Sequence, residues 1–438
     1  MIENKAKNTA SAPLVMVCIY IFLLTDRPWE SIRYLEGIPI EFPFAVLMIL
    51  VGLFTGKIRV ITSSTNKWVY SLLCLHYLLI PFSFNSEFTM EQSYEYAKAI
   101  LLYLLMLAVV EDEFSLQILV KAFIFSMMLY MLHSLWEYHN GRHEFRQGIA
   151  RMIGVDETHN DPNAFGASVV LSLPFVYVLL RSEVKSFMRK LYFSYFALAV
   201  LCVILTGSRS ASIAFVFLLL LWGVSRKGGK KIWIIMLVLL SLGVVWTAMP
   251  VDKQDRIRTL WDPDSGPKVA ADSAQGRLDG WLVSWEMFKQ NPISGVGPGG
   301  KNFVEYRIAH RIDDIIGKPP SPSQSHNLYG QVLAEFGIPG AFLFIGLVFA
   351  TWQNSRKALS ILEGYSREES LFLCSLARAI MASLLLLLLL GFAGHNFYRG
   401  LWLWMAAWSG SLVLIAETKI AYTPKVVPLS TNVSVSLP

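Results

Sequence analysis

The segment SQSHNLYGQVLAEFGIPG, residues 324–341, places polar side chains where an apolar helix begins. In a helix, Asn327, Gln331 and Glu335 are spaced at i, i+4 and i+8, so they share one face. His326 stands at the entrance of that helix, and Ser325 is positioned to be its N-cap. An imidazole titrates near neutral pH and can act as a general base. The pattern therefore predicts a functional site at this helix entrance, with His326 as its main candidate and Asn327, Gln331 and Glu335 in support.

The same helix is predicted to break at GIPG, residues 337–340, because proline and glycine kink or end helices. A short half-helix would then precede the longer apolar part. The N-terminus of a half-helix carries partial positive charge and unpaired N–H groups, which suit anionic ligands. The alternative is that His326 is an ordinary interfacial residue and that the polar stripe packs against neighbouring helices. Polar groups at membrane depth favour the functional interpretation.

Two arginines stand where they could bind an anion. Arg209 lies in TGSRSASIAF, at a tight turn between two apolar segments, and Arg277 opens the amphipathic piece RLDGWLVSWEMFKQ. A guanidinium is planar, permanently charged and matched to phosphate geometry. For Arg209 the alternative is an interfacial arginine that caps carbonyl groups. For Arg277 the alternative is a solvated surface charge. The functional interpretation makes Arg209 a ligand of an anion, whereas Arg277 by itself is read as a solvated charge.

Two further polar residues are supporting candidates. Asn163 follows Pro162 at the start of an apolar segment, where turn and N-cap chemistry is the alternative. Arg399 lies in the turn GHNFYRG together with His395, and both could line the same cavity. The acidic residues around His159 lack the spacing of metal ligands. The sequence predicts neither a metal site nor a cofactor.

Composition indicates a polytopic membrane protein. Of the 438 residues, 54% are hydrophobic and 16% are charged, whereas soluble proteins carry about 25% charged residues. The formal net charge is +6. Cytoplasmic loops of membrane proteins are enriched in Lys and Arg, so this excess indicates membrane topology and not nucleic-acid binding.

A membrane-spanning helix needs about 20 mainly apolar residues, and about twelve candidate segments are present. They centre on residues 12–25, 41–56, 67–84, 95–110, 115–137, 163–181, 190–206, 210–225, 231–249, 327–353, 373–391 and 397–416. The chain is therefore predicted to be an all-α polytopic membrane protein.

The connections divide the chain into four parts. We expect nine spans in residues 1–249, an outer loop in 250–326, three spans in 327–416 and a disordered cytoplasmic tail in 417–438. Basic residues gather in alternate loops, so the positive-inside rule places both termini in the cytoplasm. The outer loop contains the helix-like pieces RLDGWLVSWEMFKQ and KNFVEYRIAHRI, which predict a helical cap.

The order TGSRSA, then GRLDGW with NPISGVGPGGKNF, then SQSHNLYGQVLAEFGIPGAFLF resembles the O-antigen ligase and polymerase superfamily of bacterial envelope glycan transferases. The resemblance covers the chain from about residue 160. The most specific part lies in the segment 324–341, where His326 and Asn327 are followed by Glu335, Gly337 and Gly340.

The resemblance implies a fold of the GT-C type with a periplasmic cap, in the bacterial inner membrane. It implies transfer of an oligo- or polysaccharide from undecaprenyl diphosphate to an acceptor hydroxyl, such as that of a glycan or the lipid A core, without a metal. On this basis His326 is the candidate base, and Arg209 and Arg277 are candidate ligands of the donor diphosphate.

Other functions remain open at this level. Some polymerases of the superfamily carry an Arg-x10-Gly pattern in two outer loops, and no arginine in these outer loops has glycine at that spacing. This favours a ligase over a polymerase without separating the two, and protein O-glycan transferases share the same signature region. A flippase or another transporter is the competing class, although transporters commonly repeat broken helices in both halves. A scaffold in a glycan assembly complex would leave His326 and the arginines dispensable.

Overall fold

The computed structural model describes residues 10–31, 34–35, 40–56, 62–146, 149–156, 159–225, scattered positions between 232 and 247, 251–258 and 268–422. The predicted span 231–249 falls largely outside these ranges, as does the chain after residue 422.

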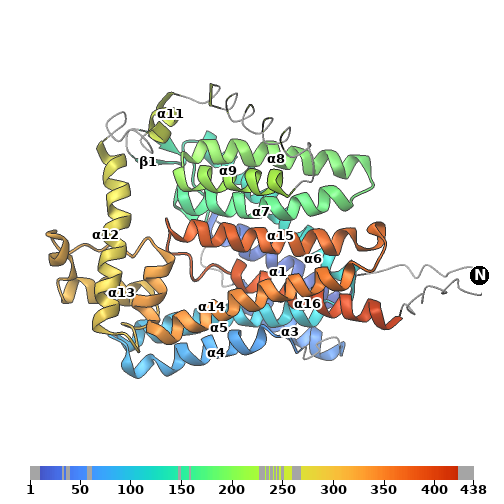
Figure 1. Ribbon diagram of the computed structural model, residues 1–438, viewed down its shortest axis with the longest axis horizontal. Coiled ribbons are helices and arrows are strands. Elements are labelled where there is room, and N and C mark those ends of the chain that lie inside the picture. Colours follow the sequence, from blue (N-terminus) through green and yellow to red (C-terminus); the bar gives the residue numbers. More distant parts are fainter. Residues whose placement is uncertain are drawn as a thin grey trace, which may run out of the picture.

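A bundle of long helices forms most of the protein, and Figure 1 shows them running along its longest axis. The bundle helices are α1 (Ala12–Asp26), α3 (Glu41–Phe54), α4 (Asn66–Leu78), α5 (Ser86–Val109), α6 (Glu113–His139), α7 (Pro162–Ser182), α8 (Ser186–Thr206), α9 (Arg209–Val224), α14 (Leu328–Leu362), α15 (Arg367–Gly391) and α16 (Leu401–Tyr422). Two short pieces, α2 (Pro28–Ser31) and the 3-10 helix η1 (Ile80–Phe82), lie in the connections. In the middle of the bundle α14 packs against α15 and α16, and α15 packs against α7.

Seven segments of the described chain are long and apolar enough to cross a membrane. They correspond to α1 with the turn after it, α6, α7, α8, α14, α15 and α16. Helices α3 and α9 are apolar but shorter. Apart from residues 231–249, each predicted span coincides with a helix of the bundle. The protein is therefore a helical, multi-pass membrane protein, as the sequence predicted.

Several of these helices have a side-chain N-cap. In α5, α6, α7, α9, α14 and α15 the residue before the first turn accepts a hydrogen bond from a backbone N–H of that turn. These N-caps are Asn85, Asp112, Asp161, Ser208, Asn327 and Ser366. Such caps satisfy N–H groups that have no partner inside the helix. The N-cap of α14 is thus Asn327, and the prediction of Ser325 was wrong.

A cap of helices covers one end of the bundle, where α12 (Lys268–Gln290) runs across the bundle direction (Figure 1). The cap also contains α13 (Gly300–Ala309) and the 3-10 helix η4 (Ile312–Ile316), and α11 (Val251–Arg258) precedes α12 in the chain. Val283, Met287 and Phe303 form a small apolar core between its elements. Asn302 of α13 donates to Thr89 Oγ1 of α5 at 2.8 Å and so attaches the cap to the bundle. The predicted helical pieces coincide with α12 and α13, although Arg277 lies inside α12 and does not open it.

The predicted break in α14 is present. Gly337 has φ 64° and ψ −158°, which are not helical angles. The backbone groups freed at the break bond to the loop that follows α12: Val296 N donates to the Ala334 carbonyl at 2.8 Å, and Ile338 N donates to the Pro292 carbonyl at 2.9 Å. The glycine-rich loop GVGPGG is therefore held against the break, and it couples the cap to α14.

One element departs from the all-helical expectation. Two three-residue strands, β1 (Glu144–Arg146) and β2 (Ile149–Arg151), pair antiparallel between α6 and α7, with Glu144 opposite Arg151. The Arg151 side chain is buried, and its Nε donates to the Thr206 carbonyl at 2.9 Å. The hairpin thereby fastens the α6–α7 connection to the end of α8.

Candidate active site

A polar cavity of about 630 Å³ lies where the cap meets the bundle. Its wall comes from the start of α7, from α12, from residues 318–326 and from the connection between α15 and α16. Four predicted site residues line it: Asn163, Arg277, His326 and Arg399. Segments that are far apart in the sequence therefore meet in one cavity of a size that suits a ligand.

His326 is held by its backbone. It has φ 49°, in the left-handed region, where histidine is among the residues that are enriched. Its neighbour Ser325 is buried, accepts a hydrogen bond from the Ser284 hydroxyl of α12 at 2.8 Å and donates to the Asn327 carbonyl at 3.0 Å. The His326 side chain itself is exposed to the cavity. The segment is thus anchored on both sides while its imidazole faces the space where a ligand would lie.

A second histidine faces the first. The rings of His326 and His395 lie 5.3 Å apart at 55°. Burial, followed by the positive charges of His326 and Arg399, lowers the pKa of His395 to about 4. His395 is therefore neutral at pH 7 and adds no positive charge beside His326.

Arg277 and Arg209 are the two arginines predicted to bind a donor. Arg277 lines the cavity, and its pKa is lowered by burial and then by the positive charge of Arg209, while Asp161 opposes the shift. Arg209 is buried at the start of α9 and is not among the described residues of the cavity wall, although its neighbour Ser210 is. Two like charges that disfavour each other create a place where an anion is stabilised.

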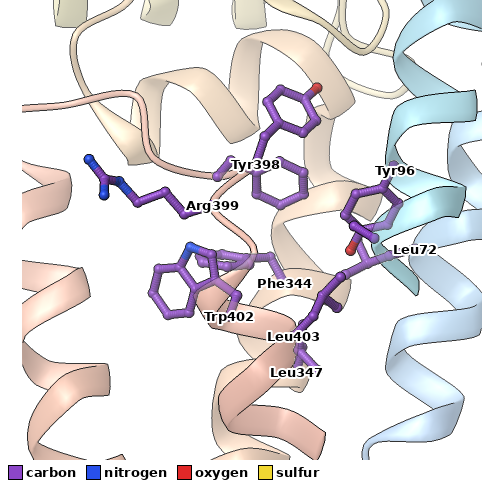
Figure 2. A pocket seen from close by; sticks show the side chains of 10 residues that line it. Leu72, Tyr96, Phe344, Leu347, Tyr398, Arg399, Trp402 and Leu403 are labelled. Carbon is purple, nitrogen blue, oxygen red and sulfur yellow. The ribbon is translucent and has the colours of Figure 1, made fainter. Parts of the chain in front are cut away.

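Arg399 is fixed by the start of α7. Its Nη1 donates to Ser168 Oγ at 2.7 Å and its Nη2 donates to the Ala164 carbonyl at 3.1 Å. In Figure 2 Arg399 points to the opposite side of the turn from Tyr96, toward the left of the view. Burial lowers the pKa of Arg399 to about 10, so the guanidinium stays charged at neutral pH.

Asn163 connects three elements at the edge of the cavity. Its Oδ1 accepts from Ser208 Oγ at 2.8 Å and from Arg151 Nη2 at 3.1 Å. The first bond ties α7 to the α8–α9 turn that carries Arg209. In these contacts Asn163 has a structural role, because it positions the turn that precedes Arg209.

The remaining supporting residues lie behind the cavity. Asn327 caps α14, where its Oδ1 accepts from Gly330 N at 2.9 Å. Glu335 is buried, accepts from Gly299 N at 2.9 Å and from Gln331 at 3.1 Å, and also bonds the Tyr398 hydroxyl. None of these three predicted residues is among the described residues of the cavity wall. The bonds of Glu335 join the α14 break to the glycine-rich loop and to Tyr398.

Two ion pairs at the cavity escaped the sequence analysis. Arg307 of α13 forms a buried two-point pair with Asp313 and donates to the Ser323 carbonyl at 2.7 Å. Lys318 pairs with Asp279 of α12. Both pairs hold residues 318–326, the segment that ends in His326, against the cap. The paired residues are 6 and 39 residues apart in the sequence and belong to different elements. Local sequence patterns therefore do not predict these pairs.

No group of three or more His, Cys, Asp and Glu side chains that could hold a metal ion was found among the residues that the structure describes. The polar character of the cavity comes from arginine, histidine and amide side chains together with the paired acids.

These observations define a multi-pass helical membrane protein with a cation-lined cavity between its bundle and a helical cap. Residues 194–345 match the family model for O-antigen ligase. The matched range runs from α8 into α14 and contains Arg209, Arg277 and His326, so the resemblance drawn from these segments is confirmed. No curated protein matches the chain. The family belongs to polysaccharide biosynthesis, and it implies glycan transfer with lipid-linked substrates.

Proposed function

We propose that the protein is an inverting, metal-independent glycosyltransferase of the O-antigen ligase type. It transfers an oligo- or polysaccharide from undecaprenyl diphosphate to an acceptor hydroxyl at the periplasmic face of the bacterial inner membrane. The observation that carries the proposal is the cavity that His326, Arg277 and Arg399 line together. The match to the O-antigen ligase family model over residues 194–345 supports the substrate class.

The chemistry follows from these residues. The acceptor oxygen attacks the anomeric carbon of the donor sugar while the bond from that carbon to the diphosphate oxygen breaks on the opposite face. The acceptor proton passes to His326, and general base catalysis of this kind contributes about 10²–10⁴-fold. Negative charge develops on the leaving undecaprenyl diphosphate, and Arg277 and Arg209 stabilise it. Fixed cations in a poorly hydrated site often contribute more to catalysis than any other group of the protein.

The proposed orientation rests on the distribution of charge. Figure 1 shows the α7–α8 and α14–α15 turns at the end of the bundle opposite α12. Basic residues mark these turns, among them Arg181, Lys185, Arg356 and Lys357. The positive-inside rule assigns that end to the cytoplasm and the cavity to the outside. The bundle is proposed to have the GT-C architecture with about twelve spans, a number that exceeds the seven segments found because several helices are short or carry charges.

The test is a deletion strain that carries wild-type or His326→Ala protein at matched membrane levels. Glycan attached to the acceptor is measured by gel, and lipid-linked glycan by extraction. We expect His326→Ala to lose the attached glycan while long lipid-linked chains accumulate. Single repeat units on the acceptor would instead indicate a polymerase. Wild-type behaviour of the variant would remove the site assignment and favour a flippase or a scaffold.

A further inference from the structure

Two uncharged protein groups hold the Arg399 guanidinium in place, whereas the cavity cations Arg307 and Lys318 are paired with the carboxylates of Asp313 and Asp279. Its Nη1 and Nη2 are engaged by Ser168 Oγ and the Ala164 carbonyl, at 2.7 and 3.1 Å. Both partners belong to the first two turns of α7, whereas Arg399 lies between α15 and α16. The other N–H groups of the guanidinium take no part in these two bonds. Arg399 lines the cavity together with His326 and Arg277.

A chain of hydrogen bonds continues behind Ser168. His159 Nε2 lies 2.9 Å from Ser168 Oγ, and His159 Nδ1 lies 2.9 Å from Asp156 Oδ1. Asp156 is buried and also accepts from the Tyr130 hydroxyl of α6. Burial alone would raise the pKa of Asp156, but His159 and the hydrogen bonds from His159 and Tyr130 lower it to about 2. The chain therefore ends on a permanent negative charge.

The connectivity Asp–His–Ser is also that of a nucleophilic triad, so the two roles must be separated. Ser168 Oγ accepts from Arg399, and its single proton is directed either to the Ala164 carbonyl at 3.2 Å or to His159 Nε2 at 2.9 Å. Ala164 and Ala167 line the cavity, but Ser168 is not among the described residues of its wall. A hydroxyl with these partners acts through Arg399 and does not attack a substrate.

We propose that Arg399 is a third ligand of the donor diphosphate and that Ser168, His159 and Asp156 are positioning residues that hold its guanidinium in the binding orientation. The inference rests on the proposed function, because the diphosphate is that of the glycan donor. An arginine whose fork is already ordered loses less freedom when it forms charge-assisted hydrogen bonds to phosphate oxygens.

The experiment measures binding of undecaprenyl diphosphate to the purified full-length protein in lipid nanodiscs. Arg399→Gln should weaken binding by ~10- to ~100-fold, the loss of a charge-assisted hydrogen bond. Ser168→Ala should weaken it by ~3- to ~10-fold, less than the loss of Arg399 itself, because the guanidinium stays charged and keeps its bond to the Ala164 carbonyl. The double variant should bind no more weakly than Arg399→Gln alone, because Ser168 acts only through Arg399. Ser168→Thr, which keeps the hydroxyl, should restore most of the affinity.

Two controls separate this inference from the proposed function. Ser182→Ala removes a hydroxyl at the other end of α7, where it donates to the Val178 carbonyl at 2.9 Å, and should bind as wild type does. Arg277→Gln tests the donor site itself. If wild-type protein fails to bind, or if Arg277→Gln binds equally well, the donor site and the inference both fall. If Arg277→Gln binds weakly but Arg399→Gln binds as wild type, only the inference is overturned. Additive losses in the double variant would overturn the positioning role of Ser168.

Discussion

Gly280 of α12 lies directly against the backbone of Ser325: a Cβ at this glycine would be 2.1 Å from the Ser325 carbonyl oxygen. One turn further along the helix, Ser284 bonds the Ser325 hydroxyl at 2.8 Å. Ser325 precedes His326, whose backbone is in the left-handed region with φ 49°. The second glycine of GRLDGW thus allows the cap helix to set the position of the candidate base.

Gly280→Ala should separate α12 from the His326 segment. Alanine is favoured over glycine inside a helix by about 1 kcal/mol, so local helix stability would rise in isolation. The clash with a backbone oxygen must nevertheless displace one of the two elements. We expect glycan transfer to fall by at least ~10-fold, since small displacements at a catalytic group cost that much or more. Transfer is measured in membranes with matched protein levels.

Gly276→Ala is the matched control for the effect of the substitution on α12. Gly276 lies one turn earlier in the same helix and has nothing within 4 Å of an added Cβ. The thermal melting temperature of the Gly276→Ala protein should equal or exceed that of the wild type. The melting temperature of the Gly280→Ala protein should be lower. Equal melting temperatures and equal transfer for the two variants would contradict the proposed role of the contact.

Arg277→Lys should lower transfer by ~10-fold or more, because a point charge does not reproduce the planar two-point contact of a guanidinium with phosphate. The effect is measured as transfer activity against donor concentration. Arg311→Lys is the control, since Arg311 is an exposed cap residue that pairs with Asp314. Full activity of Arg277→Lys would show that its role in diphosphate binding is wrong.

The stability of the protein should depend on pH through His395. Its pKa is about 4 in the folded protein, compared with 6.5 for an unperturbed histidine, and burial is the main cause. Between these values the unfolded chain binds a proton that the folded protein does not, so stability falls as the pH falls from 6.5 toward 4. His395→Gln should reduce this dependence. Melting temperatures at pH 7 and pH 5 measure it, and an unchanged difference between them would count against the neutral His395.

Glu335→Ala should destabilise the junction of cap and bundle. The substitution leaves the Gln331 amide and the Tyr398 hydroxyl without their acceptor in a buried place, while Gly299 N keeps the Tyr398 oxygen at 2.8 Å. Each buried hydrogen-bond donor left without an acceptor lowers the stability of the folded protein by about 1–3 kcal/mol, so the melting temperature should fall clearly. Glu335→Gln, which keeps an acceptor oxygen, should lose less. Glu363→Ala changes an exposed acid at the far end of α14 and serves as the control.

Several features were predictable because they depend on neighbouring residues alone. Apolar runs of sufficient length indicated the helices of the bundle, and GIPG indicated the break in α14. The signature segments around Arg209, Arg277 and His326 indicated the family, and the match over residues 194–345 includes all three. Local steric and hydropathy rules apply within a few residues of the chain, so such features can be read directly.

The identity of polar partners could not be read in this way. Glu335 shares a helix face with Asn327 and Gln331, which suggested a functional stripe, but its partners Gly299 and Tyr398 come from two other segments. Whether such a carboxylate faces a cavity or closes a buried network depends on the elements packed over it.

By itself the sequence determined that this chain is a multi-pass helical membrane protein with a segment similar to O-antigen ligase, a histidine at a helix entrance and arginines in short polar turns. The tertiary structure decided which of these residues share a cavity: His326, Arg277 and Arg399 do, whereas Glu335 does not. It also supplied the groups that hold them, such as Gly280 beneath Ser325 and Ser168 beside Arg399. The physical reason is that periodicity specifies a helix and its faces, while the meeting of segments far apart in the sequence depends on how those faces pack together.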